Sequence, residues 1–282
     1  MGFGKNDFGF GGGGGSGGGG NQNYLGDSPS TVTVQNIPSG TDISGYTLSG
    51  LLSNIYAPYV SPSFASFSVG QSTPIEVGTT ISGNKSFTWT FNAGQNVSAN
   101  TMAILDVTAS TTLASGLSIT PPASVSIGTI TNSAPAIRQW KGRATNSRSA
   151  TFDSGIYQVN WYWKLWYGTN AAPILDSTAI QALASNALKA NILGIYNLAA
   201  GDYKYFVWDD SLGSPTASTG FKDNSTGLAL AMASVGDDAF YSNVQNGWYY
   251  GLVSVTSNGI TSNKRVYRTK NMLGGTLQAI VS

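Results

Sequence analysis

The 282-residue chain contains neither cysteine nor histidine. Without cysteine, the protein can form no disulfide and no thiolate nucleophile. Without histidine, it lacks the commonest metal ligand and the usual general base near neutral pH. These absences exclude Ser-His-Asp triads, Cys-His pairs and the common zinc sites. We therefore expect a protein that is not an enzyme and holds no cofactor, and we assign no catalytic and no metal-ligating residue.

Charge is also scarce, because only 10% of the residues are charged, against about 25% in ordinary soluble domains. Glu76 is the only glutamate, and Thr, Ser, Asn and Gly take the place of the missing charged residues. This composition favours turns and strands over helices. The net charge of +1 gives no field that would attract nucleic acid. No apolar window approaches the roughly 18 residues of a membrane span, and the glycine-rich start does not resemble a signal peptide. We therefore expect neither nucleic acid nor a membrane as partner.

Residues 157–167, with the sequence YQVNWYWKLWY, show the strongest pattern in the chain. Every odd position is apolar or aromatic, whereas the even positions are mostly polar. Side chains alternate between the two faces of a strand, so this period of two predicts a long β-strand. Three of the seven tryptophans lie here, and each buries a large area. The stretch is therefore expected to be the central strand of a sheet.

Short apolar runs separated by Gly, Pro and Asn fill residues 59–170 and predict many strands with tight turns. We interpret this region as an immunoglobulin-like β-sandwich without its disulfide, with Trp89 and Trp161 in its core. Residues 171–282 are expected to form a smaller β-rich (α+β) domain with one short helix. The fold class is therefore mainly β.

Two local signals stand out in the C-terminal region. Asp176 or Ser177 can cap a helix of about three turns. The apolar face of this expected helix would consist of Ile180, Leu183, Ala184, Ala187 and Leu188. Ser257-Asn258-Gly259 lies between two strand-like runs and predicts a tight β-hairpin.

The N-terminal 58 residues differ from the rest. Residues 1–23 form a glycine-rich arm, and residues 24–58 read as a bridging or anchor segment with a strand at 30–37 and a short helix at 48–56. The arm is either a flexible tether or an assembly anchor in which Phe3, Phe8 and Phe10 dock into a neighbouring subunit.

Several stretches resemble a family of structural proteins of tailed-bacteriophage virions. They are NKRVYRTKN at 263–271, GGTLQAIVS at 274–282, residues 69–89, residues 154–168 and residues 201–208. The resemblance covers roughly residues 60–282 and leaves out the arm and the bridging segment. It implies a tail, neck or fibre component that is located in the virion, is often oligomeric and carries no catalytic residues. The partners it implies are other virion proteins and further copies of the chain, as a trimer or hexamer.

Tyr162 and Trp166 occupy even positions of the central strand and would point away from the core of the sandwich. They could be covered by the following domain, contact a partner subunit, or stack on a glycan. Burial between domains or subunits is favoured over glycan contact.

Two groups of charged residues have structural alternatives. The aspartates 209, 210, 223, 237 and 238 could bind calcium or act as a glycosidase pair, but their spacing favours turn formation. The basic groups are Arg138, Lys141, Arg143 and Arg148, and then Lys264, Arg265, Arg268 and Lys270. They could face nucleic acid or an acidic partner subunit, but without interleaved aromatic residues or a net basic charge they are interpreted as solvated strand faces, charged edge strands or subunit contacts.

The leading hypothesis is therefore a non-enzymatic virion protein that acts by assembly and through attachment to a host surface glycan or receptor. A carbohydrate-binding module or surface adhesin is the alternative, and a glycan-degrading enzyme comes third.

Overall fold

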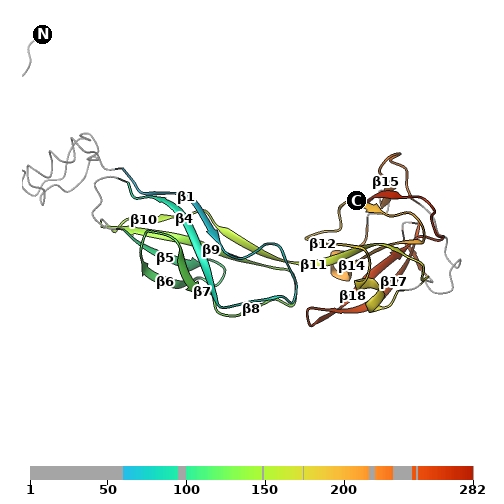
Figure 1. The fold of residues 1–282 in the computed structure, drawn as a ribbon, viewed down its shortest axis with the longest axis horizontal. Helices are drawn as coiled ribbons and strands as arrows, with labels where there is room; N and C mark the ends of the chain where they lie inside the picture. Colours follow the sequence, from blue (N-terminus) through green and yellow to red (C-terminus); the bar gives the residue numbers. More distant parts are fainter. Residues whose placement is uncertain are drawn as a thin grey trace, which may run out of the picture. The chain divides into compact units, whose positions relative to one another are not determined.

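The computed structural model describes residues 60–94, 100–147, 149–173, 175–215, 220–230, 243–245 and 247–281. Of these residues, 59% lie in strands and 4% in helices, which confirms the prediction of a mainly β protein. Apart from residues 60–62, 93 and 94, they belong to one unit, many of whose strands are labelled in Figure 1. The arm with Phe3, Phe8 and Phe10, the strand expected at 30–37 and the helix expected at 48–56 lie outside the described residues.

The first part of this unit is built from strands alone. They are β1 (Ser63–Val69), β2 (Ile75–Glu76), β3 (Thr80–Ile81), β4 (Asn84–Asn92), β5 (Asn100–Asp106), β6 (Thr111–Leu117), β7 (Ala123–Ser126), β8 (Ile130–Thr131), β9 (Ala136–Asn146), β10 (Thr151–Asp153) and β11 (Tyr157–Asn170).

The second part adds two short helices. Its elements are α2 (Ser177–Gln181), β12 (Ser185–Lys189), β13 (Gly194–Leu198), β14 (Tyr203–Asp209), the 3-10 helix η1 (Asp210–Leu212), β15 (Phe221–Asp223), β16 (Asn243–Gln245), β17 (Trp248–Ser257), β18 (Ile260–Arg268) and β19 (Leu277–Val281).

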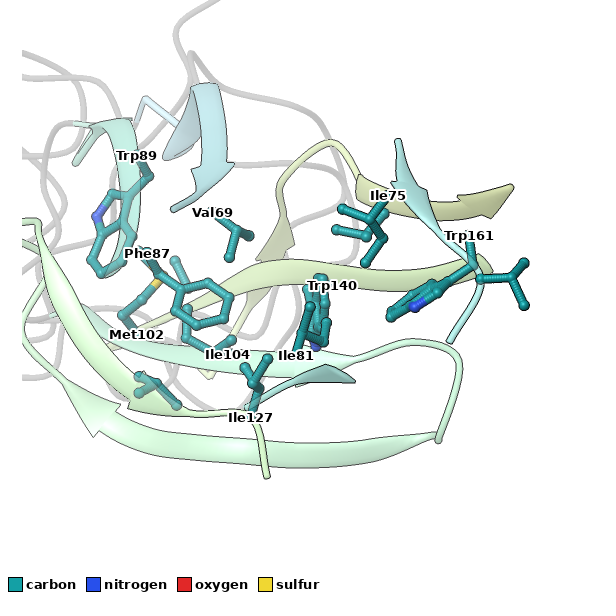
Figure 2. Close-up of a cluster of buried hydrophobic side chains, with 14 of the residues drawn as sticks. Val69, Ile75, Ile81, Phe87, Trp89, Met102, Ile104, Ile127, Trp140 and Trp161 are labelled. Atoms are coloured by element: carbon teal, nitrogen blue, oxygen red, sulfur yellow. The ribbon is translucent and has the colours of Figure 1, made fainter. Parts of the chain in front are cut away.

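Two sheets enclose the first core, a three-stranded antiparallel sheet and one end of an eleven-stranded sheet that is antiparallel except for the pairing of β2 with β11. One has the order β1-β4-β7, and the other contains β11, β9, β5 and β6 in that order, with β10 beside β9 and β2 beside β11. Phe87 and Trp89 of β4 meet Met102, Ile104 and Trp140 of the opposite sheet (Figure 2). Trp89 and Trp161 are both buried in this core, as the sequence predicts. Alternation along β4 places its aromatic side chains inward and leaves the threonines between them exposed.

The indole N–H groups of this core differ in their partners. Trp161 donates to the Thr79 carbonyl at 2.9 Å, and Trp89 donates to the Ile119 carbonyl at 2.8 Å. Among the described residues, no acceptor lies within reach of Trp140 Nε1, although this side chain is fully buried. Of the four tryptophans in this core, Trp89 and Trp161 are therefore fixed by hydrogen bonds to loop carbonyls as well as by packing, and Trp163 donates to Ser211 Oγ at 3.0 Å.

Strand β11 takes part in both parts of the unit. Residues 157–161 pair with β9 and residues 161–162 pair with β2 in the first sheet. Residues 163–167 then pair with β12, and residues 166–170 pair with β14. The odd positions from Val159 to Leu165 are buried, which confirms the alternation in the sequence. A domain boundary after residue 170 stays a prediction, and core membership changes within β11, between Trp163 and Leu165.

The second part has three layers. The central sheet contains β11, β14, β18, β17 and β16 in that order, with β12 on the other edge of β11. One face packs against the sheet β13-β19-β15 around Phe206, Trp208 and Trp248. The other face is covered by Ile180 of α2 and by Leu175 and Leu183. Because both faces are covered, β14 is buried almost throughout.

The helix expected after Asp176 is shorter than predicted. Asp176 caps it by accepting from the backbone N–H of Ala179, but the helix ends at Gln181 instead of continuing for three turns. Ala187 and Leu188 lie in β12, which supplies five ladder positions to β11. Pairing with an otherwise open strand edge outweighs the weak helical preference of this segment, whose Ser185 and Asn186 are poor helix formers.

The expected β-hairpin is confirmed. β17 and β18 pair from Tyr249 to Ser257, and the two-residue turn consists of Asn258 and Gly259. Their φ angles are 47° and 75°, which is the left-handed conformation that a type I′ turn requires.

Candidate functional site

The outward face of β11 carries a run of uncharged side chains. Ile156 precedes the strand, and Gln158, Asn160 and Tyr162 occupy alternate positions along it. Ile137 of β9 lies opposite Asn160, and Gln139 lies opposite Gln158, so both share this face. We call these six residues the amide stripe. Tyr162, which the sequence predicts to be a contact residue, is half-buried within it.

The three amides of the stripe are linked to one another. Gln139 Nε2 donates to Gln158 Oε1 at 3.1 Å, and Gln158 Nε2 donates to Asn160 Oδ1 at 2.6 Å. These bonds fix the side chains before any partner arrives. Amides ordered in this way lose little conformational entropy when a partner covers them.

Two isoleucines beside the amides remain open to solvent. Ile137 is 49% exposed and Ile156 is 54% exposed. Covering such side chains is favourable by about 25 cal/mol per Å² of apolar area. The amide stripe thus combines exposed aliphatic groups, a half-buried aromatic ring and preordered amides, which is a chemistry typical of a protein contact surface.

Charged residues at the two ends of the stripe are paired. At one end, Asp153 accepts from Lys141 Nζ at 2.5 Å and from Arg143 Nε at 2.6 Å. At the other end, Lys164 Nζ lies 3.1 Å from Glu76 Oε2. The hydrogen bond from Arg143 is the main reason that the pKa of Asp153 is lowered to about 2. The six residues of the stripe carry no charge themselves, and the charged side chains beside them are engaged in these ion pairs.

The Asp153 contacts predict a pH dependence of stability. The folded-state pKa of about 2 lies below the usual value of 3.8, so the unfolded chain takes up the proton first as the pH falls. The stabilisation by Asp153 is therefore fully present above pH 3.8 and lost as the pH falls towards 2. We expect Asp153→Asn to lower the free energy of unfolding by at most about 1 kcal/mol near pH 6, because the side chains are partly exposed.

Urea unfolding of the wild-type protein and of Asp153→Asn between pH 2 and pH 6 checks this expectation. The two curves should converge at the acid end. A stability difference that stays constant over the whole range would contradict the assignment.

Trp166 does not lie on a contact surface. It is only 2% exposed and packs with Leu175, Ile180 and Tyr205 in the second core. The alternative in which Trp166 contacts a glycan is therefore wrong. The following part of the chain covers this side chain, which is another of the alternatives from the sequence. The reason is that β11 has both faces covered once it enters the second part, so the even positions there also point into a core.

Two residues of the second basic group do not lie on a solvated strand face. Lys264 and Arg268 are 2% and 1% exposed, and they lie on β18, which has neighbours on both sides. Lys264 Nζ lies 2.9 Å from Asp209 Oδ2 and 4.3 Å from the centre of the Trp163 ring. Arg268 donates to the Pro173 carbonyl at 2.6 Å and lies over the ring of Tyr203. The interpretation as solvated or edge-guarding charges is wrong for these two residues.

The aspartates singled out in the sequence mostly shape turns. Burial alone would raise the pKa of Asp209, but hydrogen bonds from Ser211 and Lys264 outweigh it and hold the pKa below its usual value. Asp223 accepts from the backbone N–H groups of Ser225 and Thr226, both at 2.9 Å. Asp237 and Asp238 lie outside the described residues. In the part of the chain that the structure describes, no three acidic side chains come close enough together to hold a metal ion.

Comparison with known proteins identifies no relative: no family model, curated protein or solved structure matches the chain. No helix in the described part of the chain has the length and apolarity that crossing a membrane requires.

Proposed function

We propose that the protein is a structural component of a bacteriophage virion, of the tail, neck or fibre type. It acts by assembling with other virion proteins and with copies of itself, as a trimer or hexamer. The observation that carries this proposal is the amide stripe, a neutral, preordered surface with two exposed isoleucines on the central strand of the fold. The sequence resemblance to virion proteins supports the same reading.

The amide stripe suits association with a partner of similar composition. A surface without charge attracts no highly charged molecule and repels no copy of a chain whose net charge is near zero. Six residues are the centre of an interface and not the whole of it, since a stable contact takes roughly 20–30 residues from each side. Tyr162 and the isoleucines would then be the residues whose loss costs most affinity.

The first part of the unit is proposed to be an immunoglobulin-like sandwich. Two sheets packed around Trp89 and Trp161, with short turns between antiparallel strands, support this assignment. Such modules serve as scaffolds in many unrelated proteins, so the function is argued from the surface of the module and not from its fold.

Replacing Ile156 with aspartate tests the amide stripe. An aspartate buried at the centre of the interface would lack a partner, and we expect the dissociation constant of the oligomer to rise about 30-fold or more, equivalent to about 2 kcal/mol. Light scattering coupled to size-exclusion chromatography over a range of protein concentrations measures the change.

Ile195→Asp is the matched control, because Ile195 is 57% exposed on β13, away from the stripe. It should leave the association unchanged. A wild-type chain that stays monomeric at all concentrations would contradict self-assembly, and equal weakening by both variants would contradict the amide stripe as its site. Mass spectrometry of purified phage particles should find the chain among the virion proteins, and its absence there would overturn the location.

Glycan binding is a second candidate, supported by the position of Tyr162. Its half-exposed ring lies on the same face as the side chains of Gln158 and Asn160, and aromatic rings beside amides are groups that sugars contact. A glycan-array signal that disappears in Tyr162→Ala and persists in Ile195→Asp would favour this function over assembly.

A further inference from the structure

β11 is a narrow connection between the two parts of the unit, the first of which has one core and the second two. Its pairing with β9 ends at Trp161, and its pairing with β14 begins at Trp166. Between these ladders, each residue from 162 to 165 has one pairing partner, first in β2 and then in β12. A strand with a full ladder on only one side at a time is expected to bend more easily than the middle of a wide sheet.

Other contacts also join the two parts, since Trp163 Nε1 donates to Ser211 Oγ at 3.0 Å and Leu212 packs against a core of each part. The turn between β17 and β18 meets the loop that follows β2, about 180 residues earlier in the chain. Ser257 Oγ donates to Glu76 Oε1 at 2.5 Å, and Asn258 Nδ2 donates to Thr79 Oγ1 at 3.1 Å. The turn of the second part is therefore held against the first part by side-chain hydrogen bonds.

Glu76 joins three segments at this place. One carboxylate oxygen accepts from Ser257, and the other lies 3.1 Å from Lys164 Nζ on β11. Its backbone lies in β2, paired with Tyr162 of β11. The only glutamate of the chain thus connects the hairpin turn to the strand that crosses between the cores.

Gly78 marks how closely the loop approaches the turn. It has a φ of +88°, and a Cβ atom added there would lie 2.6 Å from the Asn258 carbonyl oxygen and 2.8 Å from Ile260 Cγ1. Real Cβ atoms do not tolerate such distances, so any side chain at this position must push the turn away. Ile260 also packs against the first core, which extends the contact with apolar burial.

We propose that Glu76, Gly78, Thr79, Ser257 and Asn258 form a junction lock that prevents bending at residues 162–165 of β11. With the lock closed, the two parts move as one body. With the lock open, β11 becomes a hinge. The lock acts within one chain, so it does not depend on the proposed assembly.

Distance measurements between the two parts test the lock. Because the chain has no cysteine, Ser124→Cys on β7 and Thr276→Cys before β19 provide two unique positions for spin labels. Both side chains are exposed. Double electron–electron resonance on the full chain should give a narrow distance distribution. In the same background, Gly78→Ala should broaden the distribution at least twofold.

Gly83→Ala is the matched control. Gly83 also has a positive φ, of +74°, but a Cβ atom there would meet nothing within 4 Å. Both substitutions strain the backbone to a similar degree, and only Gly78→Ala displaces the turn. The Gly83→Ala control should keep the narrow distance distribution of the spin-labelled chain that carries only the two cysteine substitutions.

A distance distribution for Gly78→Ala as narrow as that for Gly83→Ala would overturn the proposal. A broad distance distribution in the labelled chain with both glycines intact would overturn it as well. If Gly78→Ala does not fold, the double variant Ser257→Ala/Asn258→Gly carries the test, because glycine accepts the left-handed conformation of Asn258 and both lock hydrogen bonds are removed. A narrow distribution in this variant would equally refute the lock.

Discussion

Replacing Asp209 with asparagine should lower the free energy of unfolding by about 3–5 kcal/mol. The carboxylate neutralises Lys264, and both side chains are almost completely buried. Asparagine keeps a hydrogen-bond acceptor for Ser211 but removes the carboxylate that is bonded to the buried ammonium group, and only the attraction of Glu76 is left to offset its charge. The contacts of Lys264 with the rings of Trp163 and Trp166 remain, yet a desolvated contact of this kind contributes only about 2 kcal/mol, less than the ion pair that is lost. Chemical denaturation monitored by tryptophan fluorescence measures the loss.

Asp210→Asn is the matched control, one residue along the chain. Asp210 also forms an ion pair, with Arg265, but its side chain is 41% exposed. Surface pairs of this kind contribute about 0–1 kcal/mol, so this variant should change stability little. Equal losses of unfolding free energy in the two variants would show that burial does not increase the contribution of the Asp209–Lys264 pair to stability.

Replacing Trp166 with alanine should also lower the free energy of unfolding by about 3–5 kcal/mol. The indole ring fills the second core between α2 and the central sheet, and neighbouring side chains cannot close so large a cavity. Thermal unfolding followed by circular dichroism gives the change in midpoint, and urea titration gives the free energy.

Tyr162→Ala serves as the comparison on the same strand. Tyr162 is only half-buried, so its removal should cost about 1 kcal/mol. A Trp166→Ala variant as stable as Tyr162→Ala would contradict the placement of Trp166 in the core.

The sequence is most informative where one face of an element is buried and the other is open. Alternation identifies β4 and the first half of β11, because the outer face there is polar and the pattern is visible. Asn258-Gly259 identifies the hairpin, because few other dipeptides adopt two consecutive left-handed conformations. Such signals are local, and local chemistry is enough to explain them.

The predictions fail where distant segments decide the outcome. Residues 185–189 carry a helical pattern, yet they form a strand because they pair with the edge of β11. If one face of each strand is assumed to be exposed, the alternation in the sequence places Trp166 and Lys264 on the surface. In the structure a third layer covers that face and buries both side chains. The amide stripe could be found only in part, through Tyr162, because Ile137 and Gln139 come from a strand about 20 residues earlier.

The way β11 is shared has a consequence for dissecting the protein. A fragment that ends at residue 170 would keep Leu165 and Trp166 but lose the layers that bury them. The apolar end of its last strand would then be exposed and prone to aggregation. A fragment that begins at residue 171 would lack the central member of its own sheet, with β12 and β14 left unpaired along that side. Neither fragment should fold alone, because each lacks strands that its own sheet needs. Residues 63–281 should therefore be expressed, or exchanged between proteins, as one piece.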